Sequence, residues 1–221
     1  MVGAWGPDTT FYFAEGTTRN NATDGAFEEW VSFQNATDKD ANVAMTFFTS
    51  EQGTKNKTAL VAANSRRTLS VNDLIGADID AACQVTSDQP ILVERPMYFN
   101  FQNAWDGGHD VMGCNTPKKS WYFAEGTTNS DFITFVAVMN PGNSDADVTF
   151  SYLLGDGTNK EFKTTIGPKR RYTRNILEDA GANQDVSILV EGNVDIVAER
   201  PMYFNYHAWC TGGSDTLGYG I

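Results

Sequence analysis

The chain contains two copies of the same two motifs, and this duplication limits what it can fold into. The segment YFAEGTT occurs at 12–18 and at 122–128, and ERPMYFN occurs at 94–100 and at 199–205. The offsets are 110 (122 − 12) and 105 (199 − 94), so the first copy carries five extra residues between Thr18 and Phe27. A unit of this length is a domain, because solenoid repeats recur every ~20–50 residues. Any residue that the unit requires is therefore expected in both copies.

The same alignment extends into the connector between the copies. Pro7 matches Pro117, and Gly3 matches Gly113, at the offset of 110. We therefore expect two domains, residues 1–113 with a linker remnant at 1–8, and residues 114–221 with a linker at 114–120. Because the first residues repeat the connector, we also expect a two-repeat piece of a longer array, with Met1 as a start residue.

Composition argues against several classes of partner. The 221 residues carry a formal net charge of −12, whereas nucleic acids and anionic membranes are bound by clustered Lys and Arg. No apolar run approaches the ~18 residues of a membrane-spanning helix. The three cysteines do not recur between the copies, so no disulfide belongs to the repeat unit. Cys83 suits a small core residue, whereas Cys114 and Cys210 are candidates for a bond between units or molecules.

Alternating apolar residues predict strands in both copies. In the second copy Thr134, Val136 and Val138 share one face, and turn-forming residues at 140–143 end the run. Residues 71–76 and 176–181 suit single helical turns, and nothing supports a long amphipathic helix. About seven or eight short strands in ~100 residues favour an all-β fold of two tandem β-sandwich domains with immunoglobulin-like architecture. Small β-barrels are the alternative.

Both shared motifs place charges among apolar residues, and buried charges must be paired. We predict a structural clamp sealed inside each unit, in which a glutamate of one motif meets the arginine of the other through a bidentate bond. A ligand site at the repeat junction and paired catalytic carboxylates are the alternatives. The clamp residues are Glu15, Glu94, Arg95, Glu125, Glu199 and Arg200.

The glycine loops DGGHD at 106–110 and TGGSD at 211–215 also correspond. An Asp beside a Gly pair usually caps its own turn. Calcium is a weaker alternative, with Asp106, Asp110 and Asp215 as candidates, because the site would need about six to eight oxygen ligands. We therefore expect no metal site and no cofactor.

The sequence also predicts no enzyme. The two histidines, His109 and His207, align with Ser214 and Gln102, so neither is common to the copies. A Cys114–His109 dyad can be written, but no third orienting group is evident.

Exposed aromatic side chains would offer a different activity, because they stack on sugars. Trp105 and Trp209 lie beside the glycine loops and are the best candidates for a glycan site. Other candidates are Trp5, Trp30 and Trp121.

The combination of YFAEGTT, ERPMYFN and GG-x-D-x-x-G resembles a repeat found in tandem in long secreted or cell-surface proteins of actinobacteria and related bacteria. The resemblance covers nearly the whole chain twice. It implies β-rich modules of largely uncharacterised function, an extracellular or cell-surface location and a non-catalytic accessory role. It brings no known active site, so no functional residue is carried over.

Two functions are therefore expected from the sequence. The first is a non-catalytic structural module, a stalk, filament or adhesin spacer, whose partners are neighbouring repeats or homopolymer contacts. The alternative is an accessory module that binds a glycan or the cell wall. Neither function involves nucleic acid or insertion into a membrane.

Overall fold

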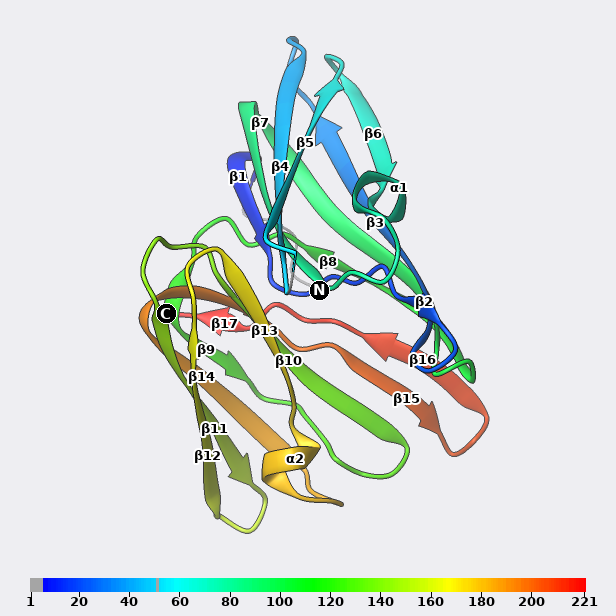
Figure 1. Ribbon diagram of the computed structural model, residues 1–221, viewed down its shortest axis with the longest axis vertical. Coiled ribbons are helices and arrows are strands. Elements are labelled where there is room, and N and C mark those ends of the chain that lie inside the picture. Colours follow the sequence, from blue (N-terminus) through cyan, green and yellow to red (C-terminus); the bar gives the residue numbers. More distant parts are fainter. Residues whose placement is uncertain (1–5, 51) are drawn as a thin grey trace.

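A computed structural model describes residues 6–50 and 52–221, and shows an all-β protein built from antiparallel strands (Figure 1). The expectations for Met1, Gly3 and Trp5 lie outside these residues. Among the described residues, helix is confined to two short turns, α1 (Val71–Ile75) and α2 (Leu177–Ala180). Each half of the chain forms its own set of sheets, and the sheet membership changes between Met112 and Lys118.

The first repeat is a sandwich of two sheets that share one long strand. The N-terminal part of β7 pairs with β1 and β4, and its C-terminal part pairs with β3 and β8. Further pairs are β4 with β5, β3 with β6, and β2 with β3. The bounds are β1 (Asp8–Phe13), β2 (Asn20–Asn21), β3 (Gly25–Asn35), β4 (Ala41–Thr49), β5 (Thr54–Val61), β6 (Ser65–Ser70), β7 (Ala81–Phe101) and β8 (Trp105–Met112).

The second repeat has the same topology with one interruption. Strand β14 pairs with β9 and β11, and β15 pairs with β10 and β16. Where β7 runs unbroken through Pro96, the second copy ends β14 at Glu199 and starts β15 after Pro201. The bounds are β9 (Lys118–Phe123), β10 (Phe132–Asn140), β11 (Ala146–Leu154), β12 (Asn159–Ile166), β13 (Arg170–Asn175), β14 (Val186–Glu199), β15 (Met202–Tyr206), β16 (Cys210–Ser214) and β17 (Tyr219–Gly220).

Shared polar residues build the same turns in both repeats. Asn35 donates from Nδ2 to the carbonyl oxygens of Lys39, Val61 and Ala62, at 2.8, 3.1 and 3.1 Å. Its counterpart Asn140 donates to three equivalent carbonyls. These bonds satisfy buried backbone acceptors that would otherwise lose their hydrogen bonds to water. Identical residues thus produce identical local structure in the two halves.

The helical turns follow the same rule. The Thr18 hydroxyl donates to the Gly76 carbonyl at 2.7 Å, and the Thr128 hydroxyl donates to the Gly181 carbonyl at 2.6 Å. Gly76 and Gly181 end the two turns at φ +96° and +85°, a region that L side chains rarely adopt.

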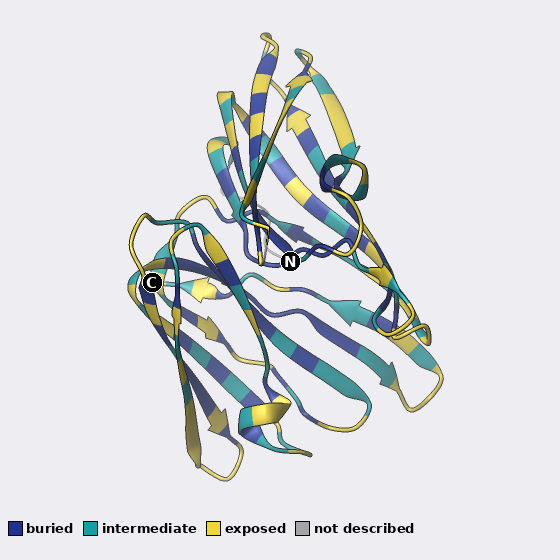
Figure 2. Cartoon of the chain, viewed as in Figure 1, coloured by how far each residue is buried: buried dark blue, intermediate teal, exposed yellow. Residues whose placement is uncertain are grey.

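Alternate strand residues point into the sandwiches, as the striped burial in Figure 2 shows. The core of the second repeat also takes in side chains of the first, namely Ala14, Phe48 and Ala82. The two repeats therefore share buried apolar surface, and this contact positions the interface described next.

Candidate interface at the repeat junction

Arg95 is the most deeply buried cation of the junction, with 1% of its surface exposed. It projects from β7 of the first repeat, where its Nη1 lies 2.7 Å from Glu15 Oε2. The same nitrogen lies 3.2 Å from Glu199 Oε2 of the second repeat, and Nη2 donates to the carboxylate of Asp215. One guanidinium therefore joins carboxylates from both repeats. Each of these short contacts lowers the cost of burying the charge.

Glu199 continues the connection into the backbone. Its carboxylate accepts the N–H groups of Ala14 at 2.9 Å and of Glu15 at 3.2 Å. The second copy of ERPMYFN thus binds the first copy of YFAEGTT. The sequence predicts that a glutamate of one motif meets the arginine of the other inside each unit, and Glu15 and Arg95 form such a pair. The pair is not sealed inside its unit, because Glu199 and Asp215 of the second repeat contact the same guanidinium.

The second repeat contains a weaker version of the internal pair. Arg200 Nη1 lies 3.1 Å from Glu125 Oε2 and 3.0 Å from the Glu125 carbonyl oxygen. The Glu125 side chain is 73% exposed. Glu94 is exposed and, among residues 6–50 and 52–221, makes no ion pair. The expectation that Glu94 takes part in a clamp is therefore corrected, because its side chain points away from the core while Arg95 points inward.

Burial sets the protonation of the junction. It raises the pKa of Glu29 to about 8, although Arg95 opposes the shift. Burial also raises the pKa of Glu15 and of Glu199. Burial alone would raise the pKa of Asp215 too, but the adjacent Arg95 guanidinium holds it below its usual range. Arg95 and Asp215 therefore form the ionised pair, and Glu29 is mostly neutral at pH 7.

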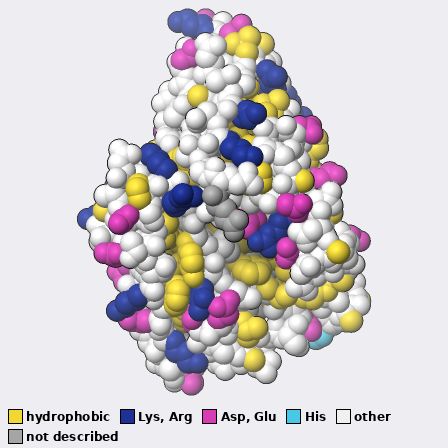
Figure 3. Space-filling model, in the orientation of Figure 1, with side chains coloured by type: hydrophobic (Ala, Val, Ile, Leu, Met, Phe, Trp, Pro, Cys, Tyr) yellow, Lys and Arg dark blue, Asp and Glu magenta, His cyan; other side chains and the backbone are white. Residues whose placement is uncertain are grey.

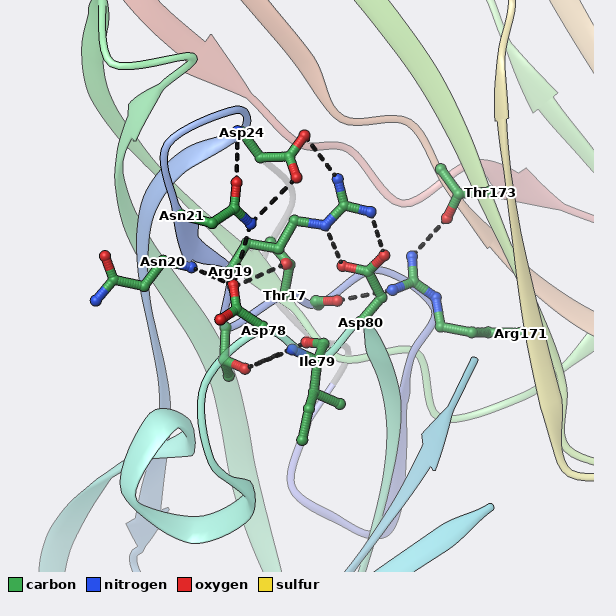
Figure 4. A network of polar contacts seen from close by, with 12 residues as sticks. Thr17, Arg19, Asn20, Asn21, Asp24, Asp78, Ile79, Asp80, Arg171 and Thr173 are labelled. Carbon is green, nitrogen blue, oxygen red and sulfur yellow. Dashed lines mark hydrogen bonds and ion pairs between the residues drawn. The ribbon is translucent and has the colours of Figure 1, made fainter. Parts of the chain in front are cut away.

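Arg171 of β13 also bridges the junction, and here the arginine belongs to the second repeat and its partner to the first. Its Nη1 donates to the Gly16 carbonyl at 2.7 Å, and its Nη2 donates to Thr173 Oγ1 at 2.6 Å (Figure 4). Beside it, Arg19 donates to both oxygens of Asp80, at 3.0 and 2.6 Å. At the equivalent positions of the second repeat, Asn129 Nδ2 donates to Asp185 Oδ1 at 3.4 Å, so an amide replaces the guanidinium there.

A cleft of about 90 Å³, partly open to solvent, lies where the repeats meet. Figure 3 shows hydrophobic side chains on its floor and both charge signs along its rim. Its lining includes Glu15, Arg19, Asp80, Phe101, Arg171 and Tyr203. Arg19 pairs with Asp80 and Asp24, Glu15 pairs with Arg95, and Arg171 donates to the Gly16 carbonyl. The cleft therefore fits an imperfectly closed interface better than the ligand site that was the alternative.

An aromatic contact completes the junction. The Tyr203 ring of the second repeat stacks on Phe101 at 4.3 Å between centroids and meets Phe99 edge-on at 4.9 Å. Strands β8 and β16 lie side by side here, which requires their glycines (Figure 1). A Cβ added to Gly213 would lie 2.6 Å from the Phe99 ring. The shared Gly pair thus permits close packing between sheets.

The structure separates the calcium candidates. Asp106 Oδ1 accepts from Asn100 Nδ2 at 2.6 Å, and Asp215 accepts from Arg95 and from the Thr216 backbone. Asp110 is half-buried on the far side of β8 from the junction. Within the described part of the chain, no group of three or more His, Cys, Asp or Glu is placed to hold a metal.

The two residues of the possible Cys114–His109 dyad have different partners. All three cysteines are free thiols in the described chain, with Cys83 and Cys114 buried. Cys114 Sγ donates to the Thr116 carbonyl. Burial lowers the pKa of His109 to about 4, and its ring packs against Phe99.

The two tryptophan candidates differ in exposure. Trp105 is half-buried against Phe101, contrary to the expectation of an exposed ring, whereas Trp209 is 76% exposed.

Sequence reasoning missed Asp215, Arg171 and Tyr203 as junction residues. Each has an identical counterpart 105 positions earlier, at Asp110, Arg66 and Tyr98. Identity between the copies at these polar and aromatic positions is the sequence signal that could have pointed to them.

Comparisons with known proteins supply no family. No protein-family model matches the chain, and no curated protein matches it. Among solved structures, the crystal structure of Thermotoga maritima 1070 is similar over 48% of this chain and 97% of that chain, at 19% identity and a TM-score of 0.44. The Anabaena sensory rhodopsin transducer is similar over 42% of this chain and 97% of its own, at 27% identity and a TM-score of 0.35.

A red sea bream transglutaminase structure matches 94% of this chain and 31% of its own, at 10% identity and a TM-score of 0.19. In the described ranges, no helix is both long and apolar enough to cross a bilayer.

Proposed function

We propose that this chain is a non-catalytic structural repeat module of an extracellular or cell-surface protein, acting as a stalk, filament or adhesin spacer. The observation that carries the proposal is the use of the duplicated residues. Arg95, Glu15, Glu199 and Asp215 all belong to segments present in both copies, and they form the contact between repeats. A spacer needs such a contact, because it fixes the angle between successive domains that a bare linker leaves free.

Small-angle X-ray scattering tests this role. We expect the chain to scatter as one particle of fixed shape, and a tandem chain of four repeats to be longer. A flexible ensemble, or a four-repeat chain with the same maximum dimension as two repeats, would contradict a spacer. Immunolabelling of intact cells tests the location, and labelling that requires lysis would contradict a surface position.

A specific observation favours glycan binding as the second candidate. Trp209 is 76% exposed at the tip of the β15–β16 hairpin, and Tyr206 beside it is 43% exposed. Such rings present flat apolar faces of the kind that stack on sugars. A pull-down with cell-wall polysaccharide tests this role, with Trp209→Ala expected to lose binding and Leu60→Ala, an exposed change elsewhere, expected to keep it. Equal retention of both variants would remove Trp209 from consideration.

A further inference from the structure

The junction uses a different surface from each repeat. We call the surface contributed by the first repeat the front face, and the surface contributed by the second repeat the back face. The front face consists of Glu15, Phe27, Arg95, Phe99 and Phe101. The back face consists of Phe135, Arg171, Glu199, Tyr203 and Asp215. The contact is therefore heterologous, so one copy of each face is left over.

Both unused faces keep nearly the same residues as the used ones. The unused front face of the second repeat consists of Glu125, Phe132, Arg200, Phe204 and Tyr206. The unused back face of the first repeat consists of Trp30, Arg66, Glu94, Tyr98 and Asp110. At these ten positions, the two substitutions between copies are Tyr206 for Phe101 and Trp30 for Phe135, and both retain an aromatic ring.

One arginine of the unused back face already has the side-chain hydrogen bond that its counterpart has in the junction. Arg66 donates from Nη2 to Thr68 Oγ1 at 2.7 Å, as Arg171 does to Thr173 Oγ1 at 2.6 Å. Tyr98 is 59% exposed, whereas its counterpart in the junction is 4% exposed.

In the described part of the chain, neither acid of that face, Glu94 or Asp110, forms an ion pair. Asp110 Oδ1 is buried without a hydrogen-bond partner in the part of the chain that the structure describes. Burial and the neighbouring Glu94 raise the pKa of Asp110. In the junction, the equivalent acids share one guanidinium.

The unused front face carries the complementary groups. Arg200 is 3% exposed, as Arg95 is 1% exposed in the junction, and the carboxylate partner of Arg200, Glu125, is 73% exposed. The rings of Phe132 and Phe204 lie 5.8 Å apart, and Tyr206 packs on Phe132 at 6.0 Å. This half-exposed aromatic group corresponds to the pocket that receives Tyr203 in the first repeat. A cation beside an aromatic pocket at one end thus faces two acids beside a tyrosine at the other.

We propose that a second copy of this chain docks head to tail, with its unused back face on the unused front face of the first molecule. Arg200 of one molecule meets Glu94 and Asp110 of the next, and Tyr98 enters the pocket of Phe132, Phe204 and Tyr206. Because a heterologous contact need not close on itself, the product is an open chain of molecules. This inference rests on the proposed structural role and specifies its partner.

The contact between molecules lacks the tether that links the repeats within one chain. Tethering by a short linker supplies an effective concentration on the order of 1 mM, so association between molecules is expected only at high concentration.

Two variants that each block one face test the arrangement. Tyr98→Asp blocks the back face, and Tyr206→Asp blocks the front face; both side chains are exposed, and thermal unfolding checks that the variants fold. Leu60→Asp, on edge strand β5 outside both faces, is the matched control. Sedimentation velocity is measured up to about 1 mM, the effective concentration that a tether supplies.

We expect the mean mass of the wild type and of Leu60→Asp to rise with concentration without a plateau. Each blocked variant should be monomeric, with an affinity reduced at least about tenfold by the unpaired charge. A 1:1 mixture should form dimers and nothing larger, because one free face remains on each partner.

A wild type that stays monomeric at about 1 mM would overturn the proposal. So would a blocked variant that still dimerises, or a mixture that stays monomeric. The fixed shape of the monomer in scattering is independent of these outcomes, so failure here is separable from failure of the spacer role.

Discussion

Replacing Arg95 with methionine removes a cation that contacts carboxylates of both repeats, while keeping an unbranched apolar stem. Removing one partner from a buried ion pair typically costs about 3–5 kcal/mol, because the remaining charge is buried without compensation. Arg95 contacts Glu15, Glu199 and Asp215, whose side chains are 6%, 0% and 0% exposed. We therefore expect the free energy of unfolding to fall by about 3–5 kcal/mol at pH 7.

Arg200→Met is the matched control, because the same residue occupies the same motif in the other repeat. The Arg200 side chain is 4% exposed, but its ion-pair partner Glu125 is 73% exposed, so the carboxylate that the variant leaves behind stays in water. We therefore assign the pair about 0–1 kcal/mol, as for ion pairs at the surface. The hydrogen bond to the Glu125 carbonyl adds about 1 kcal/mol. The control should therefore cost about 1–2 kcal/mol, clearly less than the change at Arg95.

Urea denaturation followed by tryptophan fluorescence measures both variants, and scattering reports whether the repeats separate. The cost of Arg95→Met should shrink from pH 8 to pH 5, because the orphaned carboxyls can then take up protons. Equal costs for the two variants, or a cost at Arg95 that does not depend on pH, would refute the assignment of the junction as the source of the stability.

Three further changes test other parts of the junction, and a fourth, Tyr98→Ala, is a matched comparison outside it. Because the folded pKa of Glu29 is raised to about 8, the stability linked to it is full below its unfolded pKa and is lost as pH rises towards 8. Glu29→Gln should abolish that decline in a titration of unfolding free energy, and a parallel profile would contradict the shift. Tyr203→Ala should lower the free energy of unfolding by about 3–5 kcal/mol, measured by denaturation. Tyr98→Ala, which removes the exposed counterpart, should change it by no more than about 0.5 kcal/mol. Gly213→Ala should cost about 1–3 kcal/mol by thermal unfolding because its Cβ meets the Phe99 ring, and an unchanged midpoint would show that the sheets can separate freely.

The local pattern of each repeat could be predicted from the sequence. Period-two alternation around Val136 and Val138 predicts a strand, and β10 covers both. The helical turns at 71–76 and 176–181 were also predicted, because the capping residues and glycines act within a few positions. Pro96 shows the limit of such rules. Proline cannot donate to a ladder, so Pro96 and Pro201 are expected at an edge, a strand start or a bulge. Pro201 directly precedes β15, whereas Pro96 lies inside β7, where the β3–β7 ladder has no pair at that position.

The partners of the charged residues could not be predicted in the same way. Arg95 reaches Glu199 and Asp215 across 104 and 120 positions of sequence. A local pattern says only that the charge must be paired. Glu15 and Glu94 both lie in the shared motifs, so the sequence offered no reason to choose between them as partners of Arg95. The exposure of Glu94 and the burial of Glu199 depend on which surface the other repeat covers.

The sequence by itself determined that the chain holds two equal β units and which residues they share, because local bonding and strand alternation act on each copy alike. The tertiary structure decided which copy of each shared residue is buried. Two identical units that dock through unlike surfaces must give their equivalent residues different surroundings. The same glutamate, tyrosine and aspartate are therefore enclosed at 199, 203 and 215 and left at an open face at 94, 98 and 110.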